Sequence, residues 1–176
     1  KTLEDAANLR SPLVLKGLGL AHKTEAGAVR LSLEHGDLAG AIADLPTPEF
    51  MIEEMVANAV AELLVSVVAD PVCGLMLTIG AGGVLAELLD DTVHLLLPAS
   101  RNSVKQSLTQ LRIAKILNGH RGQPAADVDE IVAAVMALQS YALANAADLA
   151  EVEINPLICT TTHAVAADAL IRISHE

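Results

Sequence analysis

The chain of 176 residues has almost no aromatic side chains, since it contains one Tyr, one Phe and no Trp. Proteins that bind single-stranded nucleic acid stack the bases on aromatic rings, and this sequence offers no such platform. Positive charge is also scarce, because 11 Lys and Arg stand against 22 Asp and Glu and the net charge is −11. A basic face that neutralises many phosphates needs more cations than this. We therefore expect no nucleic-acid partner.

Long uninterrupted apolar segments are missing too, although 52% of the residues are hydrophobic and the mean hydropathy is +0.46. The longest uncharged run, Pro71 to Ala86, is too short and too interrupted by glycine for a bilayer helix. The first residues show no charged region that leads into an apolar targeting segment. Cys73 and Cys159 lack metal-ligand spacing, so we expect two reduced, buried thiols in a cytoplasmic protein without a membrane partner.

The cations that are present form two islands. Five lie in residues 1–30 and five lie between Arg101 and Arg121, whereas residues 31–100 contain none. Two small basic islands in an acidic chain suit a compact anion such as a nucleotide phosphate. The second island is equally typical of a solvated helix face.

Strand and helix patterns interleave along the sequence. Apolar or alternating segments predict strands at 12–16, 28–33, 50–54, 61–69, 75–79, 93–97, 152–154 and 164–166. Helical spacing is present at 2–9, 37–45, 103–117 and 126–149. Because strands and helices do not follow strict βα repetition, we predict an α+β fold with mixed sheets.

A candidate anion site lies in the first basic island. Lys16 ends an apolar strand, and Lys23 follows seven residues later in the loop His22-Lys23-Thr24-Glu25-Ala26-Gly27. Lysines on both sides of a hairpin can clamp phosphate oxygens while loop amides donate to the same anion. Neither the Walker order nor a Gly-x-Gly-x-x-Gly pattern is present. A purely structural hairpin remains open as the alternative.

The strand Phe50-Met-Ile-Glu53-Glu54-Met55-Val56 is a candidate base-binding segment. Free NH and C=O groups at the end of such a strand can hydrogen-bond an adenine edge, and Met55 can pack on the purine face. Glu62 opens the next strand, where its carboxylate could accept hydrogen bonds from ribose hydroxyls. Acids that simply face water at a strand edge explain these residues equally well.

A candidate metal site lies near the C-terminal end, at Glu153-Ile154-Asn155-Pro156. Side chains alternate along a strand, so Glu153 and Asn155 should share a face. Asp168 ends the following predicted strand, thirteen residues beyond Asn155, and can lie beside it as a hairpin partner. Two or three protein oxygens with phosphate oxygens and waters are the ligands that Mg²⁺ usually takes. ATP and Mg²⁺ are therefore the expected cofactors.

These segments together resemble one family. In sequence order they are Pro12–Lys16, His22–Gly27, Phe50–Val56, Ala61–Val65, Gly80–Gly83 and Glu153–Pro156. The set is similar to the ATP-grasp domain of ADP-forming acyl-CoA synthetases, which are relatives of the succinyl-CoA synthetase β subunit, and it extends from about Ser11 to Arg172. The resemblance implies two small lobes around a nucleotide cleft, about 1–54 and about 55–176, and a fragment that lacks the first strand of the fold.

The resemblance also implies a role for each candidate residue. Phosphates would be contacted by Lys16 and Lys23, adenine by the hinge of Glu53, Glu54, Met55 and Val56, and ribose by Glu62. Mg²⁺ would be bound by Asn155 and Asp168, with Glu153 as a further candidate ligand. His22 would relay a phosphoryl group, with Lys23 beside it. The sequence departs from the family at Ala28, where the loop usually has a second Gly.

The function implied is a phosphoryl-transfer module of a ligase that converts a small carboxylic acid, CoA and ATP to acyl-CoA, ADP and phosphate through phosphohistidine. The CoA-binding domain and the domain with the primary phosphohistidine have no counterpart here and would lie on a longer chain or a partner subunit. Two alternatives stay open. An ATP-grasp ligase of the carboxylate–amine type needs no histidine in the phosphate loop, and a regulatory domain could retain the fold without catalysis.

Overall fold

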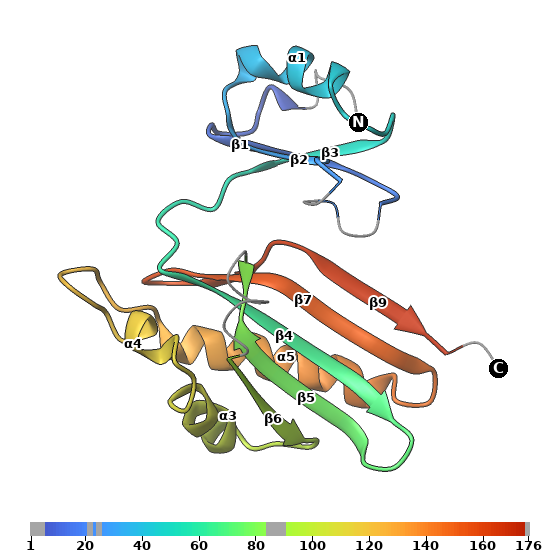
Figure 1. Cartoon of the computed structure of the whole chain (residues 1–176), viewed down its shortest axis with the longest axis vertical. Coiled ribbons are helices and arrows are strands. Elements are labelled where there is room, and N and C mark those ends of the chain that lie inside the picture. Colours follow the sequence, from blue (N-terminus) through green and yellow to red (C-terminus); the bar gives the residue numbers. More distant parts are fainter. Residues whose placement is uncertain (1–5, 21–22, 24–25, 84–90, 175–176) are drawn as a thin grey trace. The chain divides into compact units, whose positions relative to one another are not determined.

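The computed structural model describes residues 6–20, 23, 26–83 and 91–174. The chain divides into two compact units, Lys1–Val56 and Ala57–Glu176, which are described separately below (Figure 1). No helix within the described residues is long and apolar enough to cross a membrane.

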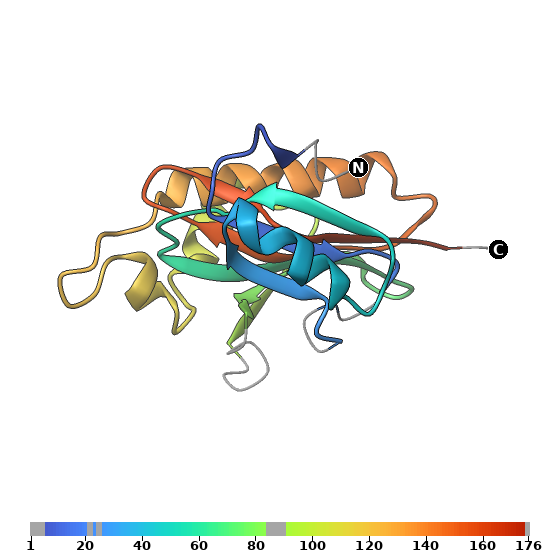
Figure 2. The ribbon, with the colours of Figure 1, turned by 90° about the horizontal axis from the view of Figure 1, so that it is seen from above.

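The first unit is built on a three-stranded antiparallel sheet with the order β2-β1-β3. Strand β1 (Leu13–Gly17) lies in the centre, between β2 (Val29–Leu33) and β3 (Phe50–Glu54). Helix α1 (Leu38–Ala43) follows the short 3-10 helix η2 (His35–Asp37) and precedes two prolines, which cannot continue a helix. A small core cluster of Ala6, Leu13 and Leu38 joins the helix to one face of the sheet (Figures 1 and 2).

The second unit contains a six-stranded sheet in which every described pairing is antiparallel. Its strands are β4 (Ala61–Asp70), β5 (Gly74–Ala81), β6 (Thr92–Leu96), β7 (Leu149–Cys159), β8 (Ala164–Ala166) and β9 (Ala169–Ile173). The order is β6-β5-β4-β7-β8, and β9 pairs with the same strand as β8. Strand β7 therefore has β4 along one edge and both β8 and β9 along the other.

Three helices pack on this sheet: α3 (Arg101–Leu108), α4 (Ala114–Leu117) and α5 (Val128–Ala144). Alternate residues of β4, including Val65 and Val67, point to the helices and join Val104 of α3 and Val135 of α5 in one core cluster. The long helix α5 begins at Asp127, whose carboxylate accepts from two backbone N–H groups at 3.1 Å. The remaining side chains of β4, such as Glu62, point to the opposite face.

Several sequence expectations need correction. The helix predicted at 103–117 is two helices, because α3 ends at Leu108 and α4 begins at Ala114. The buried carboxylate of Asp91 accepts from the backbone N–H groups of Arg112 (2.7 Å) and Ile113 (2.9 Å), directly before α4, and so holds the start of the second helix. All described strand pairings are antiparallel, which is one of the two sheet types expected for this fold, and strand β9 was not among the predicted strands.

Cys73 was expected to be buried but is exposed, since it lies in the turn between β4 and β5. The Asp70 carboxylate holds this turn by accepting from the backbone N–H groups of Val72 (2.8 Å) and Cys73 (2.7 Å). These two hydrogen bonds lower the pKa of Asp70. Cys159 is buried as expected, and burial raises the pKa of its thiol to about 12.

Candidate functional site

Lys16 is a buried cation in the central strand of the first unit. Val14 lies opposite Glu53 and Lys16 lies opposite Met51, so Lys16 and Glu53 are diagonal neighbours on one face of the sheet. Their side chains form an ion pair. A buried ammonium is costly without a counter-charge, and Glu53 supplies one. The predicted phosphate-binding Lys16 is thus fixed in place by a residue that the sequence analysis assigned to the base-binding segment.

The loop after β1 is described only in part. Lys23 lies in a turn, and its backbone carbonyl oxygen accepts a hydrogen bond from Ala28 N at 2.8 Å. Arg30 supports the end of the loop, because its guanidinium donates to the carbonyl oxygens of Gly27 and Val29. His22, the predicted phosphoryl carrier, lies outside the described residues, as do Thr24 and Glu25.

Ala28, where the resemblance leads us to expect glycine, is fully buried beside Gly17. A methyl group added at Gly17 would lie 3.1 Å from the Ala28 Cβ and 2.6 Å from the Thr47 Cγ2. Gly17 N also donates to Ala28 O at 2.7 Å. Gly17 therefore leaves the space that the Ala28 side chain needs, a relation that no local sequence pattern indicates.

The predicted base-binding segment has partners of its own. The backbone N–H of Arg10 donates to Glu54 at 3.0 Å, and the guanidinium contacts both carboxylate oxygens, with the shortest distance 3.1 Å. These hydrogen bonds lower the pKa of Glu54, the backbone bond most strongly. Met55 donates its N–H to Pro12 O at 2.8 Å, and Val56 is the last residue of the first unit. Both acids of this segment are therefore held by cations.

Glu62 lies near the start of β4, beside two glycines that follow β5. Gly82 donates to Glu62 O at 2.8 Å, and a Cβ on Gly82 would lie 2.6 Å from the Leu63 backbone. Gly83 has φ +68°, and a Cβ there would overlap the Glu62 carboxylate. The two glycines therefore let this segment pass next to Glu62 and set where its carboxylate lies.

The three predicted metal ligands meet at β7. The Asn155 Nδ2 lies 3.5 Å from the Glu153 Oε1, so both side chains lie on the same side of the strand. Asn155 N donates to Asp168 O at 3.1 Å, which places Asp168 directly beside Asn155. Asp168 does not end a strand as predicted. It lies in the link between β8 and β9, because β8 ends at Ala166.

The donors of this cluster are one amide oxygen and two carboxylates. No group of three or more His, Cys, Asp or Glu side chains that could hold a metal ion is found within the part of the chain that the structure describes. The cluster is therefore smaller than a complete all-protein cage. It fits Mg²⁺, which keeps waters and phosphate oxygens as ligands and takes few protein oxygens.

A polar row that the sequence analysis missed starts at the same cluster. Ser66 of β4 lies opposite both Glu153 of β7 and Thr78 of β5, and Thr78 lies opposite His94 of β6. Directly opposed residues in a sheet share a face. The hydroxyl of Thr78 and the His94 Nδ1 are 3.0 Å apart. Only the strand pairing reveals this row, since its members are far apart in the sequence.

Comparisons with known proteins place these features in a family. The ATP-grasp domain family matches residues 1–173. An ADP-forming acetate–CoA ligase I from Archaeoglobus fulgidus is 27% identical over 164 residues, which cover 86% of this chain and 24% of that protein. The β subunit of an ADP-forming acetate–CoA ligase I from Pyrococcus furiosus is 23% identical, over 90% of this chain and 73% of that subunit.

A solved structure of acetyl-coenzyme A synthetase 1 from Ca. Korarchaeum cryptofilum, in complex with coenzyme A and Mg-AMPPCP, has a TM-score of 0.85. It is 24% identical, and the match covers 98% of this chain and 81% of that chain. The ATP-grasp fold predicted from the sequence is confirmed. The chain spans about a quarter of the length of the first curated relatives that it matches.

Proposed function

Because the chain belongs to the ATP-grasp domain family, we propose that it is the nucleotide-binding, phosphoryl-transfer module of an ADP-forming acyl-CoA synthetase. The observation that carries the proposal is the cluster of Glu153, Asn155 and Asp168 in a chain that also holds the buried cation Lys16. The ADP-forming acetate–CoA ligases among the relatives support the reaction class. That class converts a small carboxylic acid, CoA and ATP to acyl-CoA, ADP and phosphate.

Asn155 and Asp168, with Glu153, are the residues that would hold Mg²⁺. A bound Mg²⁺ neutralises negative charge on the phosphates of ATP. Asn155 supplies its amide oxygen, and its backbone N–H already fixes it to the link that carries Asp168. Because β7 is paired on both edges, these donors are held on a rigid support.

Lys16 and Lys23 neutralise phosphate charge in this proposal. The Lys16 ammonium is already paired with Glu53, so a phosphate must share it with that carboxylate or displace the carboxylate. A charge-assisted contact is worth about 1.5–3 kcal/mol, or one to two decades in affinity. Positioning and charge neutralisation are the main contributions that a protein makes to phosphoryl transfer.

The segment 53–56 contributes to adenine binding through backbone groups and the side chains of Met55 and Val56. The carboxylates of Glu53 and Glu54 have Lys16 and Arg10 as partners, which leaves them a supporting role. Glu62, placed by Gly82 and Gly83, accepts from the ribose hydroxyls.

His22 is the proposed phosphoryl carrier. A neutral imidazole nitrogen attacks the γ-phosphorus, the bond to the β–γ bridging oxygen breaks, and ADP leaves. A histidine of a partner domain then takes the phosphoryl group, and His22 returns to its neutral form. The CoA-binding and phosphohistidine-bearing domains lie on a longer chain or a partner subunit, and we assign the assembly to the cytoplasm.

The proposal is tested first by titrating the chain with ATP and with adenosine in a calorimeter. We expect ATP to bind much more tightly than adenosine, because Lys16 and Lys23 have no charge to neutralise on adenosine. If neither ligand binds, the chain is a regulatory domain that retained the fold. In the complete enzyme, Mg·ATP should then place acid-labile phosphate on His22. A His22→Asn enzyme with a near-normal rate of acyl-CoA formation would show that no relay through His22 takes place.

A further inference from the structure

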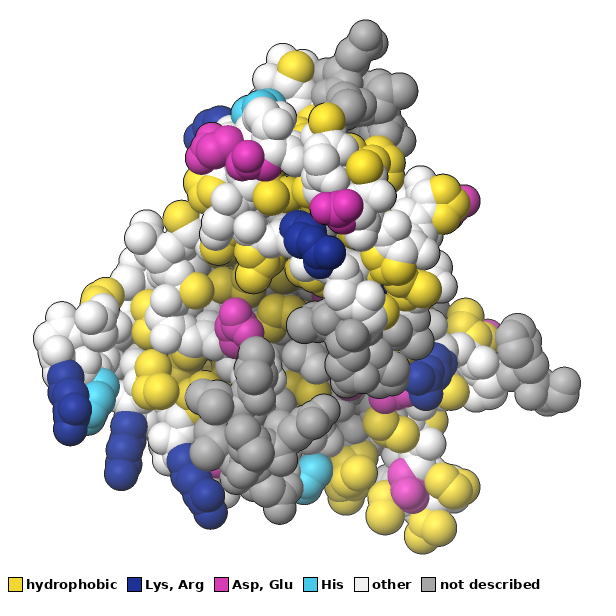
Figure 3. Space-filling model, turned by 45° about the horizontal axis from the view of Figure 1, so that its top comes forward, with side chains coloured by type: hydrophobic (Ala, Val, Ile, Leu, Met, Phe, Trp, Pro, Cys, Tyr) yellow, Lys and Arg dark blue, Asp and Glu magenta, His cyan; other side chains and the backbone are white. Residues whose placement is uncertain are grey.

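Residues 98–126 of the second unit carry positive charge without any acid. This segment contains five Lys and Arg, and none of the 22 Asp and Glu of the chain. All five cations are exposed: Arg101, Lys105, Arg112, Lys115 and Arg121. Lys and Arg side chains also follow one edge of the space-filling view (Figure 3, lower left). In a chain of net charge −11, the segment 98–126 is therefore a basic exception to the acidic composition.

The cations of α3 and those near α4 have different surroundings. Lys105 pairs with Asp129 at the start of α5 at 2.7 Å, and Lys105 and then Arg101 lower the pKa of Asp129. Asp129 at the start of α5 is therefore matched by the cations of α3. Within the described residues, no ion pair includes Lys115 or Arg121. The charge available to a partner is thus on the α4 side.

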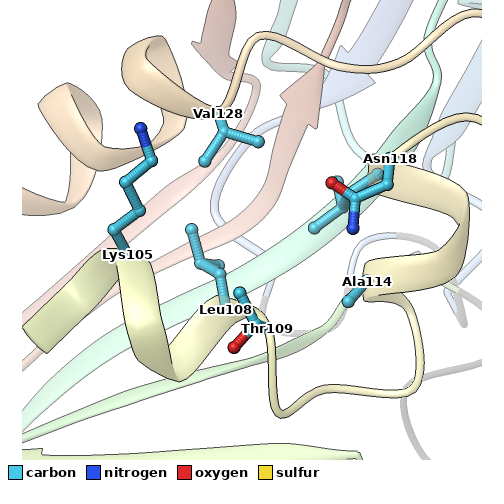
Figure 4. A pocket seen from close by; sticks show the side chains of 7 residues that line it. Lys105, Leu108, Thr109, Ala114, Asn118 and Val128 are labelled. Atoms are coloured by element: carbon cyan, nitrogen blue, oxygen red, sulfur yellow. The ribbon is translucent and has the colours of Figure 1, made fainter. Parts of the chain in front are cut away.

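A cavity of about 300 Å³ lies between α3, α4 and the start of α5 (Figure 4). It is lined by Lys105, Leu108, Thr109, Ala114, Leu117, Asn118 and Val128. In Figure 4, Leu108 and Val128 point toward one another from α3 and from the start of α5. Its volume is at the lower end of ligand pockets, which suits an inserted apolar side chain better than a cofactor.

The turn after α4 holds Arg121 in a fixed backbone conformation. Gly119 (φ 83°), Arg121 (φ 49°) and Gly122 (φ 83°) all adopt the left-handed conformation. A Cβ on Gly119 would lie 2.9 Å from Gln123 O, so the turn folds tightly on itself. Ala126 N closes it by donating to Leu117 O at 2.8 Å. A non-glycine residue in this conformation is strained, and such strain often marks a functional position.

We propose that α4 and the following turn, residues 114–125, form a docking surface for an acidic segment of a partner protein. Carboxylates of that segment contact Lys115 and Arg121, and an apolar side chain between them enters the cavity. The complementary charge argues for an acidic partner, and the cavity argues for a protein segment. A lipid surface would use a broad amphipathic helix, whereas α4 has only four residues. This proposal does not depend on nucleotide binding.

Fluorescence polarisation tests the surface with a labelled peptide of repeated Glu-Glu-Leu. A peptide of repeated Glu-Glu-Ser has the same charge but cannot fill the cavity, and we expect it to bind at least tenfold more weakly. Equal binding of the two peptides, or no binding of the first, would overturn the proposal. Binding to phosphatidylserine vesicles with no binding of the Leu peptide would identify a lipid surface instead.

The chain offers a charge variant that should not disturb folding. Arg121→Gly removes the cation and suits the positive φ, so stability should be equal or higher. Combined with Lys115→Gln, it should weaken binding of the Leu peptide about tenfold. The control Arg172→Gln removes a cation from β9, where Arg172 pairs with Glu151 at 3.3 Å, and should leave binding unchanged. If the control and the double variant lose the same peptide affinity, the peptide responds only to the net charge of the chain, and the proposal of a specific surface is refuted.

Discussion

The two units of the chain hold their candidate site residues by different means. In the first unit a small core, with Leu13 and Leu38 at its centre, supports a three-stranded sheet. Its functional candidates are fixed by charge, through the Lys16–Glu53 and Arg10–Glu54 ion pairs. In the second unit a large core supports six strands, and the candidate ligands are fixed by the backbone pairing of β7.

This difference has consequences for stability and for function. Hydrophobic stabilisation grows with buried apolar area, so the second unit should be the more stable of the two. Regions with little buried apolar area open more easily, and elements that move during binding are usually found there. We therefore expect the lysines proposed to bind phosphate to lie on the more easily opened unit, and the proposed metal ligands on the more rigid one.

The largest effect should come from truncating the second core. Leu77 is fully buried between sheet and helices, so Leu77→Ala should lower the free energy of unfolding of this unit by about 2–5 kcal/mol. Leu38→Ala makes the corresponding change in the first unit. Hydrogen exchange should show lost protection in 6–56 for Leu38→Ala, with protection in α5 and β7 retained. If both variants lose protection in both units equally, the units unfold as one block and the comparison fails.

A smaller loss of stability is expected from a substitution at Gly83, where the backbone passes close to the Glu62 carboxylate. Gly83→Ala places a methyl group on the Glu62 carboxylate at a residue of positive φ, and should destabilise the unit by about 1 kcal/mol or more. Gly74→Ala is the matched control in the same unit, because Gly74 also has a positive φ (+81°) but a Cβ there meets nothing within 4 Å. Thermal unfolding measures both. Adding Glu62→Ser should recover part of the loss, and no recovery would show that Gly83 acts through its backbone alone.

The smallest effect concerns pH in the first unit. Hydrogen bonds from Arg10 lower the pKa of Glu54 in the folded chain. A carboxylate with a lowered folded pKa stabilises the fold above its unfolded pKa, and this contribution is lost as the pH falls through the folded pKa. An NMR titration should therefore show Glu54 titrating below an ordinary glutamate, and Arg10→Gln should raise its pKa. An unchanged Glu54 titration in Arg10→Gln would mean that the ion pair does not form in solution.

The sequence was sufficient where local patterns decide the structure. Alternation along 153–155 placed Glu153 and Asn155 on the same side of a strand, and the short spacing to Asp168 brought that residue beside Asn155. Where long-range contacts decide, the sequence was insufficient. The start of α4 is held by Asp91, about twenty residues away, and the partners of Glu53 and Glu54 depend on strand register and on Arg10. Such contacts leave no periodic signal in a single sequence.

The central claim is that Lys16 acts on phosphates and Asp168 acts through Mg²⁺. The most direct test is calorimetric titration of ATP, with and without Mg²⁺, for two variants and their controls. Lys16→Met keeps the buried stem and removes the charge, and Asp168→Ala removes a metal ligand. The controls Lys115→Ala and Asp148→Ala remove exposed charges elsewhere in the second unit.

We expect Lys16→Met to weaken ATP binding by one to two decades in both conditions, since its charge contacts phosphate directly. Asp168→Ala should weaken binding with Mg²⁺ present much more than without it, and the controls should behave as the unaltered chain. If Asp168→Ala weakens binding equally in both conditions, Asp168 supports the fold and does not bind the metal. If Lys16→Met leaves the ATP dissociation constant unchanged, Lys16 does not contact phosphate and the proposed site is contradicted.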